Sequence, residues 1–293
     1  MLGSIEAGGT KFVCAISDMD MNTVKSIEIP TTSPSETMGK VKDFFLQYNI
    51  KAFGIASFGP VDIDPKSDNY GCITNTPKKL WRGFNILNYL KKVFNVPFEF
   101  NTDVNVAALG EAKYGAAQNV NSCIYITVGT GIGVGIFKNG KMQSGLSHPE
   151  MGHIAIKRST KDTFSGNCPS HQDCLEGMAS GPAIEERWKE KASLLGDNEV
   201  VWDLEAYYLA QALYTYILTL SPEKIILGGG VMKQQQLFPM IRKYLKEIDN
   251  SYLSFPEINK ENSNYIVSSG IEGKSATIGC FYLAKEKYDA LNN

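Results

Sequence analysis

Residues 122–137 read S-C-I-Y-I-T-V-G-T-G-I-G-V-G-I-F, and this stretch decides the fold class. Two runs rich in β-branched residues surround a turn in which every second residue is glycine. No helix pattern follows the glycines, so the stretch is not a dinucleotide-binding fingerprint, which needs a strand, a glycine turn and then a helix. The pattern predicts two strands joined by a tight turn whose backbone N–H groups can approach a phosphate closely.

The same arrangement of a strand, a glycine turn and a second strand is predicted at the start of the chain. Residues 2–7 and 12–17 read as strands, and Gly8-Gly9-Thr10-Lys11 joins them. Taken alone this second turn is an ordinary hairpin as readily as a phosphate loop. Two such hairpins indicate a duplicated α/β architecture in which each half presents one hairpin to the same phosphate chain. The phosphate-binding candidates are Gly9, Thr10, Lys11, Gly129, Thr130, Gly131 and Gly133.

The first half continues with alternating strands and helices. We predict strands at 24–29, 52–57 and 96–100, and helices at 34–47, 86–94 and 106–114. Asp103 follows a strand and precedes a helix, which is the edge of an open α/β sheet where ligands bind. An aspartate that only caps the helix is the alternative interpretation.

The second half has a similar order. Gly181-Pro182 opens a helix predicted to run to about residue 192, and a long apolar helix covers 204–220. A strand at 222–227 ends in Gly228-Gly229-Gly230-Val231, which either leaves an open face for a flat ligand such as a purine or is a tight turn before the helix at 237–248. A last strand at 265–269 precedes a final helix at 274–285, which is apolar enough to pack back on the first half.

Cysteine and histidine gather in one segment. All three histidines lie between residues 148 and 171, and the pattern C-x-x-H-x-x-C occurs at 168–174. Thiolate and imidazole are the ligands that zinc prefers, and a structural site takes four of them in a tetrahedron. The predicted ligands are His153, Cys168, His171 and Cys174. His148 is left over because Pro149 restricts its backbone. Ordinary polar residues and buried thiols are the alternative.

Composition excludes several classes of protein. The 293 residues are 43% hydrophobic and carry a net charge of −2, so a full core is expected and a basic nucleic-acid surface is not. Six cysteines are too few for a disulfide scaffold in a chain of this length. The N-terminus has no signal-peptide pattern, and no window is long and apolar enough for a membrane helix. We expect a cytoplasmic protein that binds no membrane.

Seven motifs together resemble one known family. They are I-E-A-G-G-T-K at 5–11, F-G-P-V-D at 58–62, N-T-D-V-N-V-A-A-L-G-E at 101–111, T-V-G-T-G-I-G-V-G at 127–135, H-P-E-M-G-H at 148–153, C-P-S-H-Q-D-C-L-E-G at 168–177 and L-G-G-G-V at 227–231. In this order they resemble the ROK family of sugar kinases, and most closely its bacterial fructokinase branch. The resemblance covers nearly the whole chain.

The resemblance implies the two-lobed, actin-like ATPase fold. Residues 1–116 would form an N-terminal ribonuclease H-like lobe, with 274–293 packing back on it. Residues 117–273 would form the C-terminal ribonuclease H-like lobe, which includes the zinc stretch 148–177, and the active site would lie in the cleft between the lobes. The implied protein is a homodimer that phosphorylates fructose at its 6-hydroxyl with ATP and Mg²⁺, and its Zn²⁺ is structural.

The resemblance also implies roles for residues. Asp103 matches the general base. The implied sugar-binding residues are Asn75, Asp103, Glu150, His153 and Glu176. The implied nucleotide-binding residues beyond the two hairpins are Gly181, Pro182, Gly228, Gly229, Gly230 and Val231.

Three departures from the family pattern stand out. Glu6 occupies a position that usually carries aspartate, Thr102 stands where many members have asparagine, and C-x-x-H-x-x-C replaces a cysteine-rich motif. All three variants are typical of the fructokinase branch.

Other functions stay open at this point. A kinase for mannose, glucose or N-acetylmannosamine would differ only in pocket detail. A non-catalytic, zinc-stabilised sugar-binding or regulatory protein is the alternative of another class. A family repressor needs an N-terminal DNA-binding domain, and here the first phosphate loop begins by residue 8.

Overall fold

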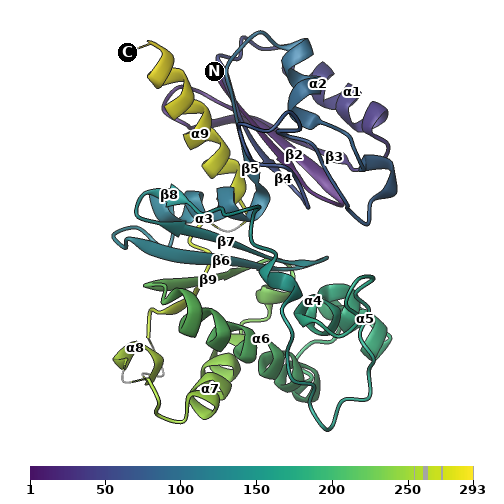
Figure 1. Ribbon diagram of the computed structural model, residues 1–293, viewed down its shortest axis with the longest axis vertical. Helices are drawn as coiled ribbons and strands as arrows, with labels where there is room; N and C mark the ends of the chain where they lie inside the picture. The colour runs from purple at the N-terminus through teal and green to yellow at the C-terminus, as the bar shows by residue number, and fades with distance from the viewer. Residues whose placement is uncertain (254, 260–262, 272, 293) are drawn as a thin grey trace. The chain divides into compact units, whose positions relative to one another are not determined.

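The computed structural model describes residues 1–253, 255–259, 263–271 and 273–292. Its first sheet has the strand order β3-β2-β1-β4-β5. The strands are β1 Leu2–Ala7, β2 Lys11–Ser17, β3 Thr23–Pro30, β4 Ala52–Ser57 and β5 Phe98–Thr102. The pairs β1–β2 and β2–β3 are antiparallel, whereas β1, β4 and β5 run parallel (Figure 1).

The second sheet repeats this topology in the order β10-β9-β6-β7-β8. Its strands are β6 Ser122–Val128, β7 Ile132–Lys138, β8 Lys141–Met142, β9 Lys224–Gly228 and β10 Ile266–Ser268. The central strand again has an antiparallel hairpin on one side and two parallel strands on the other. The duplicated architecture expected from the two glycine hairpins is therefore confirmed.

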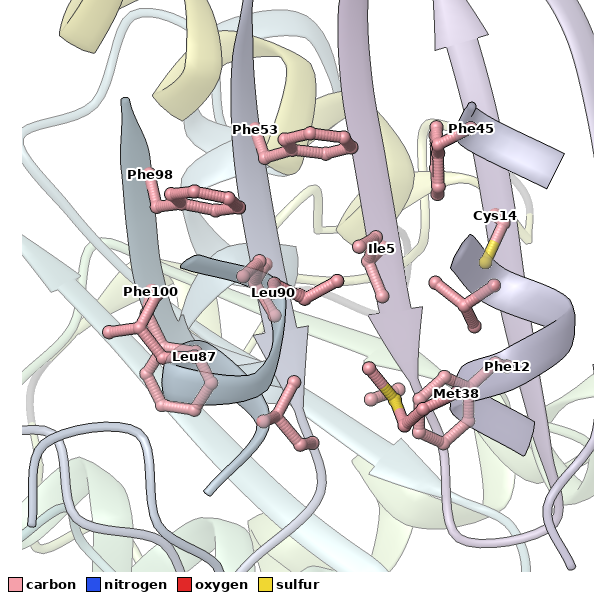
Figure 2. Close-up of a cluster of buried hydrophobic side chains, with 14 of the residues drawn as sticks. Ile5, Phe12, Cys14, Met38, Phe45, Phe53, Leu87, Leu90, Phe98 and Phe100 are labelled. Atoms are coloured by element: carbon pink, nitrogen blue, oxygen red, sulfur yellow. The ribbon is translucent and has the colours of Figure 1, made fainter. Parts of the chain in front are cut away.

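Two helices cover one face of the first sheet, α1 Pro34–Phe45 and α2 Ile86–Val93. Between them and the strands lies a cluster of buried hydrophobic side chains, and Figure 2 shows several phenylalanine rings among them along the sheet. Phe53 and Phe98 stack with ring centroids 5.3 Å apart, and Phe45 meets Phe53 edge-on at 4.9 Å. Such pairs add specific geometry to the area that they bury.

The C-terminal helix α9, Ser275–Asn292, packs on the opposite face of the same sheet. Successive strand residues point to opposite faces, so Phe53 faces α1 while its neighbour Gly54 faces α9. A Cβ atom at Gly54 would lie 2.0 Å from the Cys280 carbonyl oxygen, so the helix backbone rests directly on β4. The final helix therefore packs on the first half of the chain, as expected.

The remaining helices are α3 Asp103–Tyr114, α4 Leu175–Ala179, α5 Gly181–Trp188, α6 Glu199–Leu220, α7 Leu237–Asp249 and α8 Pro256–Asn259. Short 3-10 turns occur at Lys79–Trp81, Met151–His153, Ala192–Leu194 and Val231–Lys233. Among the helices of the described ranges, none is long and apolar enough to cross a membrane.

The chain divides into two compact units. The first contains Met1–Gln118, Gly135–Pro149 and Lys274–Asn293, and the second contains Asn119–Val134 and Glu150–Gly273. The segment 135–149 thus belongs to the first unit, whereas we expected it within 117–273. The reason is close packing on α3, because a Cβ atom at Gly135 would lie 1.9 Å from the Val104 carbonyl oxygen.

Several helix boundaries differ from the sequence prediction, and α9 continues to Asn292 rather than 285. Helix α3 begins at Asp103 rather than 106, because the Thr102 side chain accepts a hydrogen bond from the Asn105 N–H and so caps the helix. Helix α5 ends at Trp188 rather than 192, where Lys189 adopts a left-handed φ of 60°. Helix α6 begins at residue 199, one turn before the apolar run that predicted it.

Candidate functional site

The four predicted metal ligands lie together in the second unit. One ligand atom from each of the four residues lies within 4.8 Å of all the others. The Nδ1 atom of His153 is 3.6 Å from the Cys168 sulfur and 3.5 Å from the Cys174 sulfur, and His171 Nδ1 is 3.9 Å from Cys168. A zinc ion bonded at about 2.3 Å to sulfur and 2.0 Å to nitrogen in a tetrahedron places such atoms about 3.5 Å apart. The donor set therefore fits a tetrahedral zinc site.

A tight backbone turn brings the two cysteines to one place. Cys168 and Gln172 exchange both backbone hydrogen bonds, at 3.2 and 2.9 Å, and Gln172 has a left-handed φ of 56°. The Leu175 N–H then bonds to the Ile154 carbonyl, which places Cys174 beside the segment that carries His153. A Cβ atom at Gly177 would lie 1.9 Å from the Gln172 carbonyl oxygen, so this turn requires glycine at 177.

The third histidine lies elsewhere, in the first unit. His148 is buried, and its Nε2 atom accepts a hydrogen bond of 3.1 Å from the Val61 N–H. Burial lowers the pKa of His148, which favours the neutral ring that this acceptor role requires. Sequence reasoning left this residue without a role, and the structure makes it the partner of a buried backbone amide.

Two carboxylates accompany the four candidate metal ligands. Glu176 accepts a hydrogen bond of 2.9 Å from the Ile132 N–H, and its other oxygen lies 3.9 Å from His153 Nε2. His153 therefore turns one ring nitrogen to the sulfur atoms and the other toward a carboxylate, an arrangement that orients metal-bound histidines in proteins. Glu150 is exposed, yet the protein atoms crowded around its carboxyl group and the nearby Glu176 raise the pKa of Glu150 to about 7.

The glycine turn at 129–131 lies against this assembly. The Gly129 N–H bonds to the Gly131 carbonyl at 2.9 Å, and the Gly181 N–H bonds to the Gly129 carbonyl at 2.7 Å. A Cβ atom at Gly131 would lie 2.7 Å from a Glu176 oxygen, and one at Gly229 would lie 2.4 Å from the Val128 carbonyl. The predicted phosphate turn, the start of α5 and the turn after β9 thus come together.

The other predicted nucleotide-binding residues of the second unit lie in or next to the elements that surround this turn. Thr130 is exposed at its tip, and Gly133 lies inside β7 rather than in the turn. Pro182 is in the first turn of α5, which Ser180 caps by accepting a hydrogen bond from the Ala183 N–H. Gly228 ends β9, Gly230 follows, and Val231 is buried in a 3-10 turn.

The first unit holds the other glycine turn. The Gly8 N–H bonds to the Lys11 carbonyl at 3.0 Å, and the Thr31 hydroxyl donates to the Gly8 carbonyl at 2.7 Å. Thr10 is exposed, and the Lys11 ammonium pairs with Glu28 on β3. The position expected for a Cβ at Gly9 lies 3.6 Å from the Lys78 side chain. Lys78 is a cation near the turn that sequence reasoning missed, because it comes from a distant loop.

Asp103 is the first residue of α3, where the helix dipole favours a negative charge. One of its carboxylate oxygens accepts a hydrogen bond of 2.9 Å from the Val104 N–H. The predicted sugar ligand Asn75 is exposed in the loop before Lys79–Trp81. The capping alternative for Asp103 is wrong, because Thr102 occupies that role.

Asn105 is a second residue that sequence reasoning missed. Its amide donates to Asn101 at 3.0 Å and to the Gln143 carbonyl at 3.2 Å, and its oxygen accepts from the Ile136 N–H at 3.0 Å. Asn105 is 1% exposed, and its bond with the Ile136 N–H is buried. A polar amide inside the apolar run V-N-V-A-A was the available signal, and its role is to hold the start of α3 beside β7.

Comparison with known proteins decides the family. The model of the ROK family matches residues 2–287. The chain belongs to the ROK family. A Bacillus subtilis (strain 168) protein with a provisional fructokinase name is 52% identical, with 99% of this chain and 97% of that protein covered. The Lactococcus lactis subsp. cremoris fructokinase is 44% identical, with 96% of each chain covered. The Pediococcus pentosaceus fructokinase is 43% identical, with 97% of this chain and 98% of that protein covered.

Solved ROK structures share the fold of this ROK protein. The ROK hexokinase from Thermus thermophilus is 22% identical and superposes with a TM-score of 0.77, with 99% of each chain covered. A ROK family glucokinase from Streptomyces griseus, in complex with glucose and AMPPNP, is 23% identical with a TM-score of 0.76, and 97% and 99% of the two chains are covered. The expected two-sheet sugar-kinase fold is therefore confirmed.

Proposed function

We propose that this ROK protein transfers the γ-phosphoryl group of ATP to the 6-hydroxyl of fructose. The observation that carries the proposal is its identity of 43–52% to proteins named fructokinase over nearly the full length of both chains. The motifs with the required chemistry, N-T-D-V-N and the two glycine turns, are present in the same chain.

Asp103 would accept the proton of the attacking hydroxyl. As the oxygen of that hydroxyl bonds to the γ-phosphorus, the bond from this phosphorus to the β,γ-bridging oxygen breaks and ADP leaves. The carboxylate suits this role because it stands at the carboxyl end of β5 and at the positive end of α3. Phosphoryl transfer depends on positioning and charge stabilisation more than on covalent chemistry by the protein.

The glycine turns would hold the phosphates of the nucleotide. Thr130 and Gly131 in the second unit, and Gly9 to Lys11 in the first, would turn backbone N–H groups to the anion, whereas the Gly129 N–H closes the turn on the Gly131 carbonyl. Gly181, Pro182 and the turn from Gly228 to Val231 would serve the adenosine side. The close packing of Gly229 on Val128 supports this assignment, because any side chain there would displace the turn.

Zinc would be held by His153, Cys168, His171 and Cys174. Four protein ligands leave no open coordination position, so the ion would be structural. Glu150, His153 and Glu176 would then receive the sugar hydroxyl groups, together with Asn75. The 3.5–3.9 Å spacing of the donor atoms supports the metal, and the Glu176 contact with Ile132 supports a fixed carboxylate beside it.

Mg²⁺ would enter with ATP and neutralise charge on the β- and γ-phosphates. Glu6 lies near the end of β1, and its carboxylate would accept a hydrogen bond from a water molecule bound to that cation. Burial raises the pKa of Glu6, and a nearby cation would favour its ionised form. The Thr277 hydroxyl donates a hydrogen bond of 3.3 Å to the Glu6 carboxylate. This bond would hold the glutamate side chain, which is longer than the aspartate usual at this position.

The test is coupled ATP turnover on fructose, mannose, glucose and N-acetylmannosamine. We expect fructose to have the highest kcat/KM. A higher kcat/KM on glucose or another hexose would assign a different kinase, and binding of sugar without turnover would favour a regulatory protein. A homodimeric state and a cytoplasmic location remain part of the proposal.

A further inference from the structure

Helix α6 carries a row of polar side chains that face the segment 151–162. The row consists of Tyr208, Gln211 and Tyr216, and its two tyrosines are buried, with at most 1% of their surface exposed. Both the helix and the segment belong to the second unit. The segment contains only a 3-10 turn and an isolated bridge at Ala155, so most of its backbone groups need partners from outside.

Tyr216 contacts the end of the segment nearest the proposed sugar site. Its hydroxyl donates a hydrogen bond of 2.6 Å to the Met151 carbonyl. Met151 begins the 3-10 turn that carries Glu150 at one end and His153 at the other, and the His153 N–H closes this turn on the Glu150 carbonyl at 3.0 Å. One hydroxyl group therefore holds the backbone between a proposed sugar ligand and a proposed metal ligand.

The opposite side of the same turn is held by β7. A Cβ atom at Gly152 would lie 1.7 Å from the Ile132 carbonyl oxygen, so the turn backbone presses against the first residue of that strand. The turn is thus clamped between Ile132 and Tyr216. The metal can hold only one end of the turn, through His153.

The rest of the row anchors the remainder of the segment. The Gln211 amide bonds to both backbone groups of Lys157, at 2.9 and 3.1 Å. The Tyr208 hydroxyl donates to Asp162 at 2.7 Å, and Arg187 pairs with the same carboxylate at 3.2 Å. The Arg187 and Asp162 side chains are 7% and 4% exposed, so solvent screens this ion pair little.

We infer that Tyr216 is a positioning residue for Glu150, and that α6 anchors the sugar-side segment independently of the metal. The inference rests on the proposed function. Without the hydroxyl, the Met151 carbonyl loses its donor inside the protein and the 3-10 turn gains freedom to rotate. The Glu150 carboxylate would then spend less time in the orientation that accepts a hydrogen bond from a sugar hydroxyl, and the sugar would bind more weakly. The phosphate turn would keep its own contacts at Gly181, Gly229 and Glu176.

The test compares Tyr216→Phe with Tyr214→Phe in the zinc-loaded protein. Tyr214 is the matched control because its hydroxyl pairs with Asp249 on α7. Hexose affinity is measured by calorimetry without ATP, using the panel sugar that the wild-type enzyme accepts best. The KM for ATP, kcat, zinc stoichiometry and Tm are measured in parallel.

We expect Tyr216→Phe to weaken hexose binding about 3- to 10-fold, the range for one lost neutral hydrogen bond. The KM for ATP and the zinc content should stay at wild-type values, and Tyr214→Phe should match the wild type in hexose affinity. Unchanged hexose affinity in Tyr216→Phe would overturn the inference and leave the proposed function standing. Parallel losses in hexose and ATP affinity, or a protein that does not fold, would assign Tyr216 a merely structural role and also overturn it. A wild-type protein that phosphorylates no panel sugar would overturn the proposed function itself.

Discussion

Glu176 accepts a hydrogen bond from the Ile132 N–H at 2.9 Å, and this bond joins the segment with the proposed metal ligands to the strand that follows the glycine turn. The same carboxylate would collide with any side chain at Gly131 and lies 3.9 Å from the His153 ring. One residue therefore stands between the proposed phosphate turn and the proposed zinc ligand. Through these contacts the proposed zinc site and the proposed phosphate turn form one assembly.

Replacement of Glu176 tests this link. We expect Glu176→Ala to lower the free energy of unfolding by about 1–3 kcal/mol, because it leaves the Ile132 N–H without its acceptor. Glu176→Gln retains an acceptor oxygen and should restore most of that stability. Urea unfolding of both variants measures the difference. Equal losses in the two variants would mean that the charge, not the hydrogen bond, carries the stabilisation.

Gly131→Ala should weaken ADP binding. The new methyl group would lie 2.7 Å from a Glu176 oxygen, so the turn or the carboxylate must shift. The control is Gly39→Ala in α1, where an added Cβ has nothing within 4 Å and alanine favours the helix by about 1 kcal/mol. Calorimetric titration with ADP is the measurement, and wild-type affinity in Gly131→Ala would show that the turn does not contact the nucleotide.

Asp103→Asn should abolish turnover while nucleotide binding persists. A general base contributes typically about 10² to 10⁴-fold to the rate, and asparagine can still accept the Val104 N–H hydrogen bond that the aspartate accepts. The measurement is kcat with fructose, together with ADP affinity as the test of correct folding. A kcat near the wild-type value would remove Asp103 from the mechanism.

Loss of the metal should weaken sugar binding more than nucleotide binding. Cys168→Ala, or a strong chelator, would remove the ion that we propose ties His153 to the 168–174 turn, and structural zinc in general contributes folding free energy directly. Sugar affinity and Tm should both fall, whereas ADP binding largely persists. Cys72→Ala is the control, because Cys72 lies outside the metal cluster. Native protein without stoichiometric zinc would contradict the assignment.

His148 predicts one component of the pH dependence of stability. Burial lowers the pKa of His148 below its ordinary value of 6.5, so the unfolded state binds the proton more readily than the folded state. The stability contributed by the neutral ring is therefore complete above pH 6.5 and is lost as the pH falls below that value. His148→Gln keeps an acceptor for the Val61 N–H but does not titrate. Urea unfolding at pH 7.5 and 5.5 should show a larger loss in the wild type than in His148→Gln, and equal losses would contradict this role.

Local sequence patterns determined most of the elements, the duplicated topology and the candidate metal ligands. Glycine hairpins between β-branched runs identified both β1–β2 and β6–β7, because strand propensity and turn chemistry act over a few neighbouring residues. The close spacing of Cys168, His171 and Cys174 likewise restricts which atoms can meet, so the sequence predicted that these side chains cluster, and they do.

Tertiary structure alone decided what these elements touch. Asn105, Lys78 and Tyr216 make contacts with residues that are distant in the chain, and no local pattern specifies such partners. The place of 135–149 in the first unit depends on how closely Gly135 approaches α3, and the role of His148 depends on a buried amide 87 residues away. The physical reason is that burial and hydrogen-bond pairing depend on which surfaces meet when the whole chain packs, whereas propensity and spacing are properties of a short segment.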